Sequence, residues 1–228
     1  MPVFRRGLGS SSRSCSQNNP GVEVDHGLFL NAKVGTMEAF LADNPEDGDY
    51  NQYWYSEYTI KQMVADIEAQ GPECRVAYLS TPSIFFSMSE ELQKVSKVFD
   101  YDKKWESDPG FVFYDYNKPE EVPKDLLKSF DLVVVDPPFI VREVWEKYAV
   151  TCKLLLKEGH DENGVPLGRM LLTTVNENHA MLQEILGKEV MMTAFMPSIP
   201  NLVYQYNLYT NYASEVFSKK NPEIPDFD

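Results

Sequence analysis

Short apolar runs alternate with amphipathic stretches along the chain from Tyr53 onward. The apolar runs are rich in β-branched and aromatic residues and are too short for helices, so each predicts a buried strand. Five such strands are expected, over residues 75–80, 98–100, 111–114, 132–135 and 170–174. Two later β-like runs, 190–196 and 202–209, predict a hairpin that closes the domain.

Helices are predicted where apolar residues recur every three or four positions. They are expected around residues 30–41, 60–67, 85–95, 144–155 and 181–185. Ser56 is placed to cap the second of these helices, and Gly71 and Gly187 are placed to end the second and the last. The alternation of strands and helices predicts an α/β fold with a mainly parallel sheet covered by helices on both faces.

The composition fits one folded domain preceded by a tail. With 228 residues, 43% of them hydrophobic, the chain can bury one sizeable core. Residues 1–24 are rich in Ser, Gly, Asn and Pro and are predicted to be disordered, which leaves 25–228 as a single domain. Cys74 and Cys152 sit in apolar patterns and are expected in the core, and no disulfide or metal-site spacing is visible. Because no secretory signal or membrane-spanning run is found, we expect a cytoplasmic protein.

Charge is distributed unevenly along the chain. The net charge is −14, but residues 1–20 carry three arginines and no acid, so the rest carries 18 basic against 35 acidic side chains. A broad phosphate-binding face needs many basic side chains, so this balance argues against a nucleic-acid substrate, although a local basic groove is compatible with it. A basic protein partner is the better match.

The most informative stretch is the predicted strand that ends in Asp136-Pro137-Pro138-Phe139. In an open α/β sheet, ligands bind beyond the carboxyl ends of the strands. The pattern of an acid, two prolines and an aromatic resembles the signature of S-adenosylmethionine-dependent methyltransferases that act on amino nitrogens. A carboxylate and a carbonyl held stiffly by proline can accept the N–H hydrogens of an amine and orient its lone pair. The alternative is an ordinary strand-to-helix turn in which Asp136 caps backbone amides.

Polar residues also follow the first three strands, where a cofactor is expected. The loop after the first strand lacks the glycine that commonly allows close approach to the methionine part of the cofactor. An acid after the second strand can accept both ribose hydroxyls; Asp100 is preferred for its place at the strand end, and Asp102 stays open. For each acid the alternative is a solvated strand-end charge. The residues predicted to bind the cofactor are Ser80, Thr81, Pro82, Asp100, Asp102, Asp115 and Tyr116.

Three consecutive aromatic residues, Tyr53, Trp54 and Tyr55, precede the predicted helix at 60–67. One buried face does not need all three, so they are candidates for lining the mouth of the cofactor or substrate site. The alternative is a hydrophobic staple that packs the start of the helix. Asn201 follows a proline-flanked segment and is a candidate for shaping the same cleft, with a turn role as its alternative.

Several motifs occur together in one order: Gln-Tyr-Trp-Tyr-Ser at 52–56, Phe-Asp-Tyr-Asp at 99–102, Phe-Tyr-Asp-Tyr-Asn at 113–117, Asp-Pro-Pro-Phe at 136–139 and Asn-Leu at 201–202. From Leu28 onward the chain resembles the lysine methyltransferases of eukaryotic translation elongation factor 1-alpha (the type 1, or yeast fifth, enzymes), first labelled N6-adenine methyltransferases. The resemblance implies a seven-stranded Rossmann-like class I methyltransferase fold and S-adenosylmethionine as donor. It also implies a lysine of elongation factor 1-alpha as acceptor and a cytoplasmic enzyme that acts as a monomer.

The resulting hypothesis is direct methyl transfer to a protein lysine. Asp136 and the Pro137 carbonyl would hold the ε-amine while Phe139 and Trp54 enclose its methylene stem. Desolvation and the adjacent sulfonium would lower the pKa of that lysine, so no dedicated base is required. Two alternatives stay open: N6-adenine methylation of RNA or DNA, with Phe139 stacking on a flipped base, and a catalytically silent adaptor.

Overall fold

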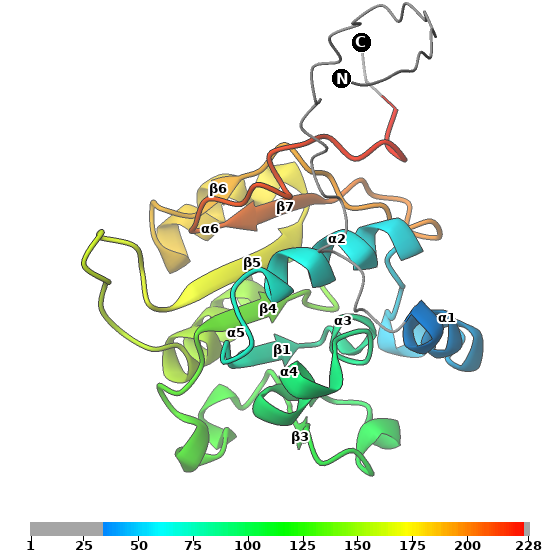
Figure 1. The fold of residues 1–228 in the computed structure, drawn as a ribbon, viewed down its shortest axis with the longest axis horizontal. Helices are drawn as coiled ribbons and strands as arrows, with labels where there is room; N and C mark the ends of the chain where they lie inside the picture. The colour runs from blue at the N-terminus through cyan, green and yellow to red at the C-terminus, as the bar shows by residue number, and fades with distance from the viewer. Residues whose placement is uncertain (1–33, 226–228) are drawn as a thin grey trace, which may run out of the picture. The chain divides into compact units, whose positions relative to one another are not determined.

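The computed structural model describes residues 34–225, which are built around one seven-stranded sheet (Figure 1). The strand order is β3-β2-β1-β4-β5-β7-β6. The strands β1 to β5 are parallel, and β7 lies antiparallel between β5 and β6. The strands are β1 (Val76–Leu79), β2 (Lys97–Asp100), β3 (Phe111–Phe113), β4 (Leu132–Val135), β5 (Arg169–Thr174), β6 (Met191–Met192) and β7 (Asn207–Thr210). The predicted α/β, Rossmann-like fold is confirmed.

Helices cover both faces of the sheet, because each central strand is apolar on both sides. Tyr78 and Val134 pack on one face with residues of α2, α3 and α4, whereas Leu79 and Val135 pack on the other with α5 and α6. The α-helices are α1 (Val34–Asp43), α2 (Glu57–Glu68), α3 (Pro82–Phe85), α4 (Glu90–Val95), α5 (Arg142–Leu155) and α6 (His179–Leu186). The described 3-10 helices are η2 (Gly48–Tyr50), η3 (Lys103–Trp105), η4 (Pro119–Glu121), η5 (Lys124–Leu126) and η6 (Asn176–Asn178).

Most of the predicted elements and caps are confirmed. Ser56 caps α2 by accepting a hydrogen bond from the Thr59 amide, and Gly187 lies at the carboxyl end of α6. Cys74 and Cys152 are buried free thiols. The prediction of a disordered tail over 1–24 and the first part of the helix predicted at 30–41 lie outside the described residues. No helix in the described part of the chain has the length and apolarity to cross a membrane.

Two predicted elements are wrong in detail. The helix expected over 85–95 is divided into α3 and α4, because Ser89 takes an extended conformation and starts a new helix. The apolar residues of that stretch are nevertheless core residues, as predicted. The long hairpin expected over 190–209 is reduced to the two-residue β6 and the four-residue β7. The backbone leaves the strand conformation after Met192, and the Phe195 side chain packs in the core instead.

Candidate functional site

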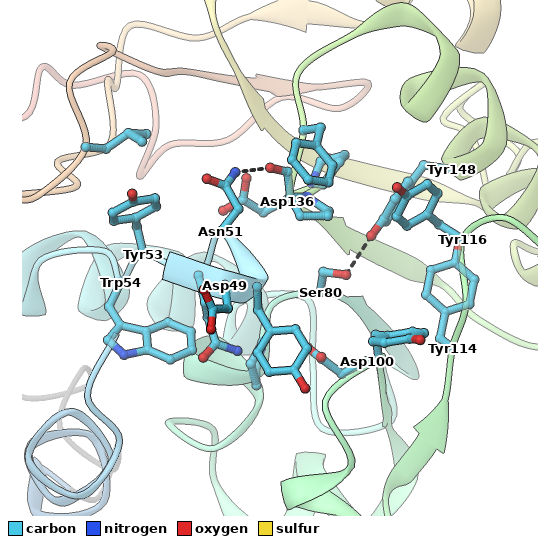
Figure 2. A pocket seen from close by; sticks show the side chains of 18 of the residues that line it. Asp49, Asn51, Tyr53, Trp54, Ser80, Asp100, Tyr114, Tyr116, Asp136 and Tyr148 are labelled. Atoms are coloured by element: carbon cyan, nitrogen blue, oxygen red, sulfur yellow. Dashed lines mark hydrogen bonds between the residues drawn. The ribbon is translucent and has the colours of Figure 1, made fainter. Parts of the chain in front are cut away.

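A cavity of about 300 Å³ opens at the carboxyl ends of β1 to β4, where the sequence places its polar motifs (Figure 2). It brings together residues from six strand-end or loop segments, and from α5, that are far apart in the sequence. Of the residues predicted as site residues, it is lined by Tyr53, Trp54, Ser80, Pro82, Asp100, Asp115, Tyr116, Asp136, Pro137, Pro138 and Phe139.

Four predicted site residues do not line this cavity. Thr81 is buried, and its hydroxyl donates to the Val134 carbonyl at 3.4 Å. Asp102 caps η3 by accepting from the Lys104 amide and pairs with the Lys104 ammonium at 3.1 Å, so its carboxylate is used locally. The side-chain amide of Asn201 donates to Glu46 and borders a neighbouring hollow.

Tyr55 is the fourth residue outside the cavity. Its side chain is only 3% exposed, and it contacts the site from behind through a hydrogen bond to Asp136. The predicted aromatic cluster is thus divided by role. Trp54 borders the cavity while packing edge-on against Phe40 at 5.3 Å, and Tyr53 lines the cavity half-buried.

The glycine-free loop after β1 turns at Ser80, which has a φ of 57°. This left-handed conformation is uncommon for residues other than glycine. The Ser80 amide donates to the Phe99 carbonyl at 2.9 Å, and its hydroxyl lies 2.6 Å from the Tyr148 hydroxyl. The chain therefore makes the close turn at the strand end without glycine, and the hydrogen bonds of the serine hold it there.

Asp100 ends β2 inside the cavity and is 7% exposed. Burial raises its pKa to about 6, against the opposing effect of the hydrogen bond that its carboxylate accepts from the Asp102 amide. Beside it, the rings of Tyr101 and Phe113 lie 5.4 Å apart and are exposed. A carboxylate and flat rings at this end suit a ribose hydroxyl pair and an adenine.

Tyr116 and Tyr148 form the wall beyond Asp100. Their rings are stacked at 5.9 Å with an interplanar angle of 28°, and both line the cavity (Figure 2). Tyr114 joins them edge-on to Tyr148 at 5.6 Å. Sequence reasoning missed Tyr148 because it fits the apolar stripe of α5, and that stripe gives no sign of which position reaches the strand ends.

Asp136 lies at the end of β4, half-buried, with its backbone amide donating to the Leu79 carbonyl at 3.2 Å. Its Oδ2 accepts a hydrogen bond of 2.6 Å from the Tyr55 hydroxyl, which in turn lies 2.6 Å from the Thr173 hydroxyl. Burial raises the pKa of Asp136 to about 7, while the hydrogen bonds of Tyr55 and Thr173 lower it.

A turn at residues 47–52 borders the cavity beside the Asp-Pro-Pro-Phe motif. Asn51 has a left-handed backbone with a φ of 53°, and its side-chain amide donates to the Pro138 carbonyl (Figure 2). Gln52 of the same turn accepts from the Lys104 ammonium at 3.1 Å. Asn51 was missed from the sequence because its partner lies 87 positions away. These contacts fix the turn to the Asp-Pro-Pro-Phe motif on one side and to η3, which follows β2, on the other.

A comparison with family models matches residues 46–214 to the family described as "Probable N6-adenine methyltransferase". EEF1A lysine methyltransferase 1 of Danio rerio is 33% identical over 180 residues, covering 74% of this chain and 99% of the relative. The Homo sapiens protein of that name is 33% identical over 175 residues, covering 74% of this chain and 76% of the relative. Protein-lysine N-methyltransferase EFM5 of Saccharomyces cerevisiae is 26% identical and covers 83% of this chain and 80% of the relative.

A comparison with solved structures supports the fold. The branched-chain polyamine synthase of Thermus thermophilus superposes with a TM-score of 0.54 at 15% identity, covering 77% of this chain and 62% of the other. The match to the family model extends over the motifs that line the cavity. The chain therefore belongs to the family described as probable N6-adenine methyltransferases, in which relatives are named as lysine methyltransferases of elongation factor 1-alpha.

Proposed function

We propose that the chain is an S-adenosylmethionine-dependent protein-lysine N-methyltransferase that acts on translation elongation factor 1-alpha. The observation that carries the proposal is the place of Asp136, a half-buried carboxylate at one end of a cavity whose other end holds Asp100 and the stacked tyrosines. The names of the relatives support the acceptor. The acidic charge of the chain is complementary to a basic protein acceptor.

The chemistry of the cavity fits the proposed cofactor. Asp100 can accept the hydrogen bonds of two ribose hydroxyls, and Tyr116 can stack on the base while Asp115 accepts from its amino group. The turn at Ser80 brings backbone close to the middle of the cavity. When bound there, S-adenosylmethionine supplies a methyl group that is already activated for transfer to an amine.

The residues at the other end would receive the acceptor amine. Asp136 accepts an N–H hydrogen of the ε-amine, and the Pro137 carbonyl is a candidate to accept a second, which aims the nitrogen lone pair into the cavity. Pro138 is held by Asn51, so the backbone of the motif is fixed before the acceptor arrives. Phe139 is 49% exposed at the mouth, where its ring can pack on the methylene stem of a lysine. Tyr53 and Trp54 are proposed to complete that wall.

Labelled methyl donor and a cell extract test the class of acceptor. After the reaction, the extract is divided into halves treated with nuclease or with protease. Label that survives nuclease and is lost with protease is expected, because the acceptor is a protein. The reverse result would favour N6-adenine methylation, the second candidate, which the description of the family model supports and which the Asp-Pro-Pro-Phe motif alone does not distinguish.

The remaining predictions from sequence stay predictions. They are a tail over residues 1–24, one domain over 25–228, a monomer, and a cytoplasmic location. The silent-adaptor alternative depended on the glycine-free loop, and the left-handed turn at Ser80 removes that argument because the loop makes the close turn without glycine. Calorimetry with S-adenosylmethionine is the direct check, and absence of binding at millimolar concentration would return the adaptor to consideration.

A further inference from the structure

Tyr55 contacts the reactive end of the site without lining it. The residue directly precedes Ser56, the cap of α2, and its side chain is almost fully buried. Its hydroxyl lies 2.6 Å from Asp136 Oδ2 and 2.6 Å from Thr173 Oγ1. Three segments separated by 81 and 118 positions thus converge on one hydroxyl group, which is more than packing of the helix start requires.

We infer that Tyr55, supported by Thr173, is a positioning residue that holds the Asp136 carboxylate oriented and ionised to receive the acceptor amine. The inference rests on the proposed function and deepens it. Neither side chain touches the substrate in this assignment, so both act through Asp136.

Proton counting gives the hydrogen bonds a direction. A carboxylate can only accept, so the single proton of the Tyr55 hydroxyl is donated to Asp136. The Tyr55 oxygen is then free to accept. The Thr173 hydroxyl lies 2.6 Å from this oxygen and 3.5 Å from the Val135 carbonyl, so it donates to the nearer Tyr55 oxygen. Thr173 is 1% exposed on β5, the strand next to β4, so the chain of donors starts from the rigid centre of the sheet. Such a chain strengthens each hydrogen bond within it.

The hydrogen bond from Tyr55 leaves acceptor positions on Asp136 for the substrate. An ionised carboxylate offers about four lone-pair positions, and Tyr55 uses one of them on Oδ2 from the buried side. Because Asp136 also lines the cavity, the remaining positions are available to an incoming amine. Without the Tyr55 hydroxyl, the carboxylate would lose the donor that fixes its rotation.

The charges around Asp136 make these hydroxyl groups important. In the described part of the chain, the titratable groups that influence it or respond to its charge are the tyrosines Tyr55, Tyr148 and Tyr206, and no cation is paired with it. Burial favours the neutral acid, and the hydrogen bond from Tyr55, supported by the Thr173 hydroxyl behind it, opposes burial by lowering the pKa. Removal of either donor therefore moves the titration of Asp136 to higher pH.

The test compares Tyr55→Phe with wild-type protein in two measurements. The first is the pH profile of methyl transfer to elongation factor 1-alpha. We expect a fall in kcat on the order of 10-fold or more at neutral pH, an acid limb displaced to higher pH, and unchanged affinity for S-adenosylmethionine. Thr173→Val is expected to move the profile in the same direction by less, and Thr173→Ser to restore it because the hydroxyl is kept.

The second measurement does not depend on the acceptor. In protein labelled with ¹³C-aspartate, NMR follows the titration of the Asp136 carboxyl, whose signal is assigned by its loss in Asp136→Asn. A higher pKa in Tyr55→Phe supports the inference. If wild-type protein fails to methylate elongation factor 1-alpha but this displacement is present, the proposed acceptor fails and the role of Tyr55 stands.

Tyr212→Phe is the matched control. Tyr212 donates to another buried carboxylate, Asp66, at 2.5 Å, and neither residue lines the cavity. This variant loses one hydroxyl from a similar pair and is expected to keep the wild-type pH profile. A Tyr55→Phe protein that is folded in thermal melting, with the same acid limb and the same Asp136 titration as wild type, would overturn the inference. An equal displacement of the acid limb in Tyr212→Phe would also overturn it, because the effect would then be structural.

Discussion

Two tyrosine–carboxylate pairs lie near the two ends of α2, and only one of them is suited to chemistry. Tyr55, just before α2, donates to Asp136 at 2.6 Å, and Tyr212 donates to Asp66 within α2 at 2.5 Å. Burial raises the pKa of both carboxyls. Tyrosine, carboxylate and burial are therefore common to both pairs and do not by themselves mark a functional site.

The difference lies in how many acceptor positions the protein itself uses. Asp66 is 2% exposed, and its second oxygen accepts from Ser214 at 2.5 Å while Arg169 lowers its pKa through its charge. Within residues 34–225 no cation is paired with Asp136, which lines the cavity. One carboxylate is satisfied and holds the carboxyl-terminal segment against α2, whereas the other is left partly available. The two carboxylates therefore differ in one respect: only Asp136 keeps acceptor positions that face the cavity.

The largest expected effect follows from removing Asp136. We expect Asp136→Ala to lower methyl transfer on the order of 10³-fold, because the group that orients the amine is lost. Affinity for S-adenosylmethionine, measured by calorimetry, is expected to stay near the wild-type value. Asp66→Ala is the matched variant and should retain the turnover of the folded protein. Equal losses of methyl transfer in both variants would show that Asp136 and Asp66 do not differ in function.

A third carboxylate, Asp100, tests whether access to the cavity is the feature that matters. It lines the cavity without a tyrosine partner in the described hydrogen bonds. Loss of a charged acceptor for the ribose in Asp100→Asn is expected to weaken S-adenosylmethionine binding by about 10- to 100-fold. The neighbouring Asp102→Asn should bind almost normally, because Asp102 caps η3 outside the cavity. The reverse order of affinities in calorimetry would reassign the ribose to Asp102.

The Asp66 pair is expected to matter for stability. Asp66→Ala leaves the Tyr212 and Ser214 hydroxyls without their acceptor, so the free energy of unfolding should fall by about 1–3 kcal/mol. Chemical denaturation measures this loss, and Lys61→Ala on the exposed side of α2 serves as a control of small effect. A decrease in turnover per folded molecule would place Asp66 in the reaction and contradict its purely structural role.

The last expected effect is a change in the pH dependence of stability. The pKa of Asp136 is raised from 3.8 in the unfolded chain to about 7, so the native state binds the proton more tightly and stability falls as pH rises between these values. Asp136→Asn stays neutral, so it should melt at a higher temperature than wild type above pH 7 and lose that advantage toward pH 4. Equal melting temperatures across this range would show that the buried charge has no cost.

Most of the fold was predictable because its signals are local. Apolar runs such as Leu132–Val135 are buried on both faces, so each central strand is visible without its neighbours. The division of the helix at Ser89 was not predictable, since the apolar spacing continues across it. The late hairpin was predicted too long because Phe195 has strand propensity but is taken by the core on the α2 side.

The site was predictable where residues follow strand ends, and not where they arrive from elsewhere. Asp100 and Asp136 follow strands, so topology places them together. Tyr55 was expected to line the mouth, but its position beside Trp54 cannot show that it points to the back of Asp136. Asn51 depends on a partner in a distant loop, and only the three-dimensional fold reveals it.

The most direct test of the account is intact-mass and peptide mass spectrometry of purified elongation factor 1-alpha after incubation with S-adenosylmethionine and the enzyme. We expect methyl groups on a lysine with wild-type protein, a strongly reduced level with Tyr55→Phe, and none above background with Asp136→Ala at matched cofactor occupancy. Equal methylation by wild type and Asp136→Ala would contradict the role of the carboxylate. An unmodified elongation factor, with label instead on adenine, would contradict the acceptor.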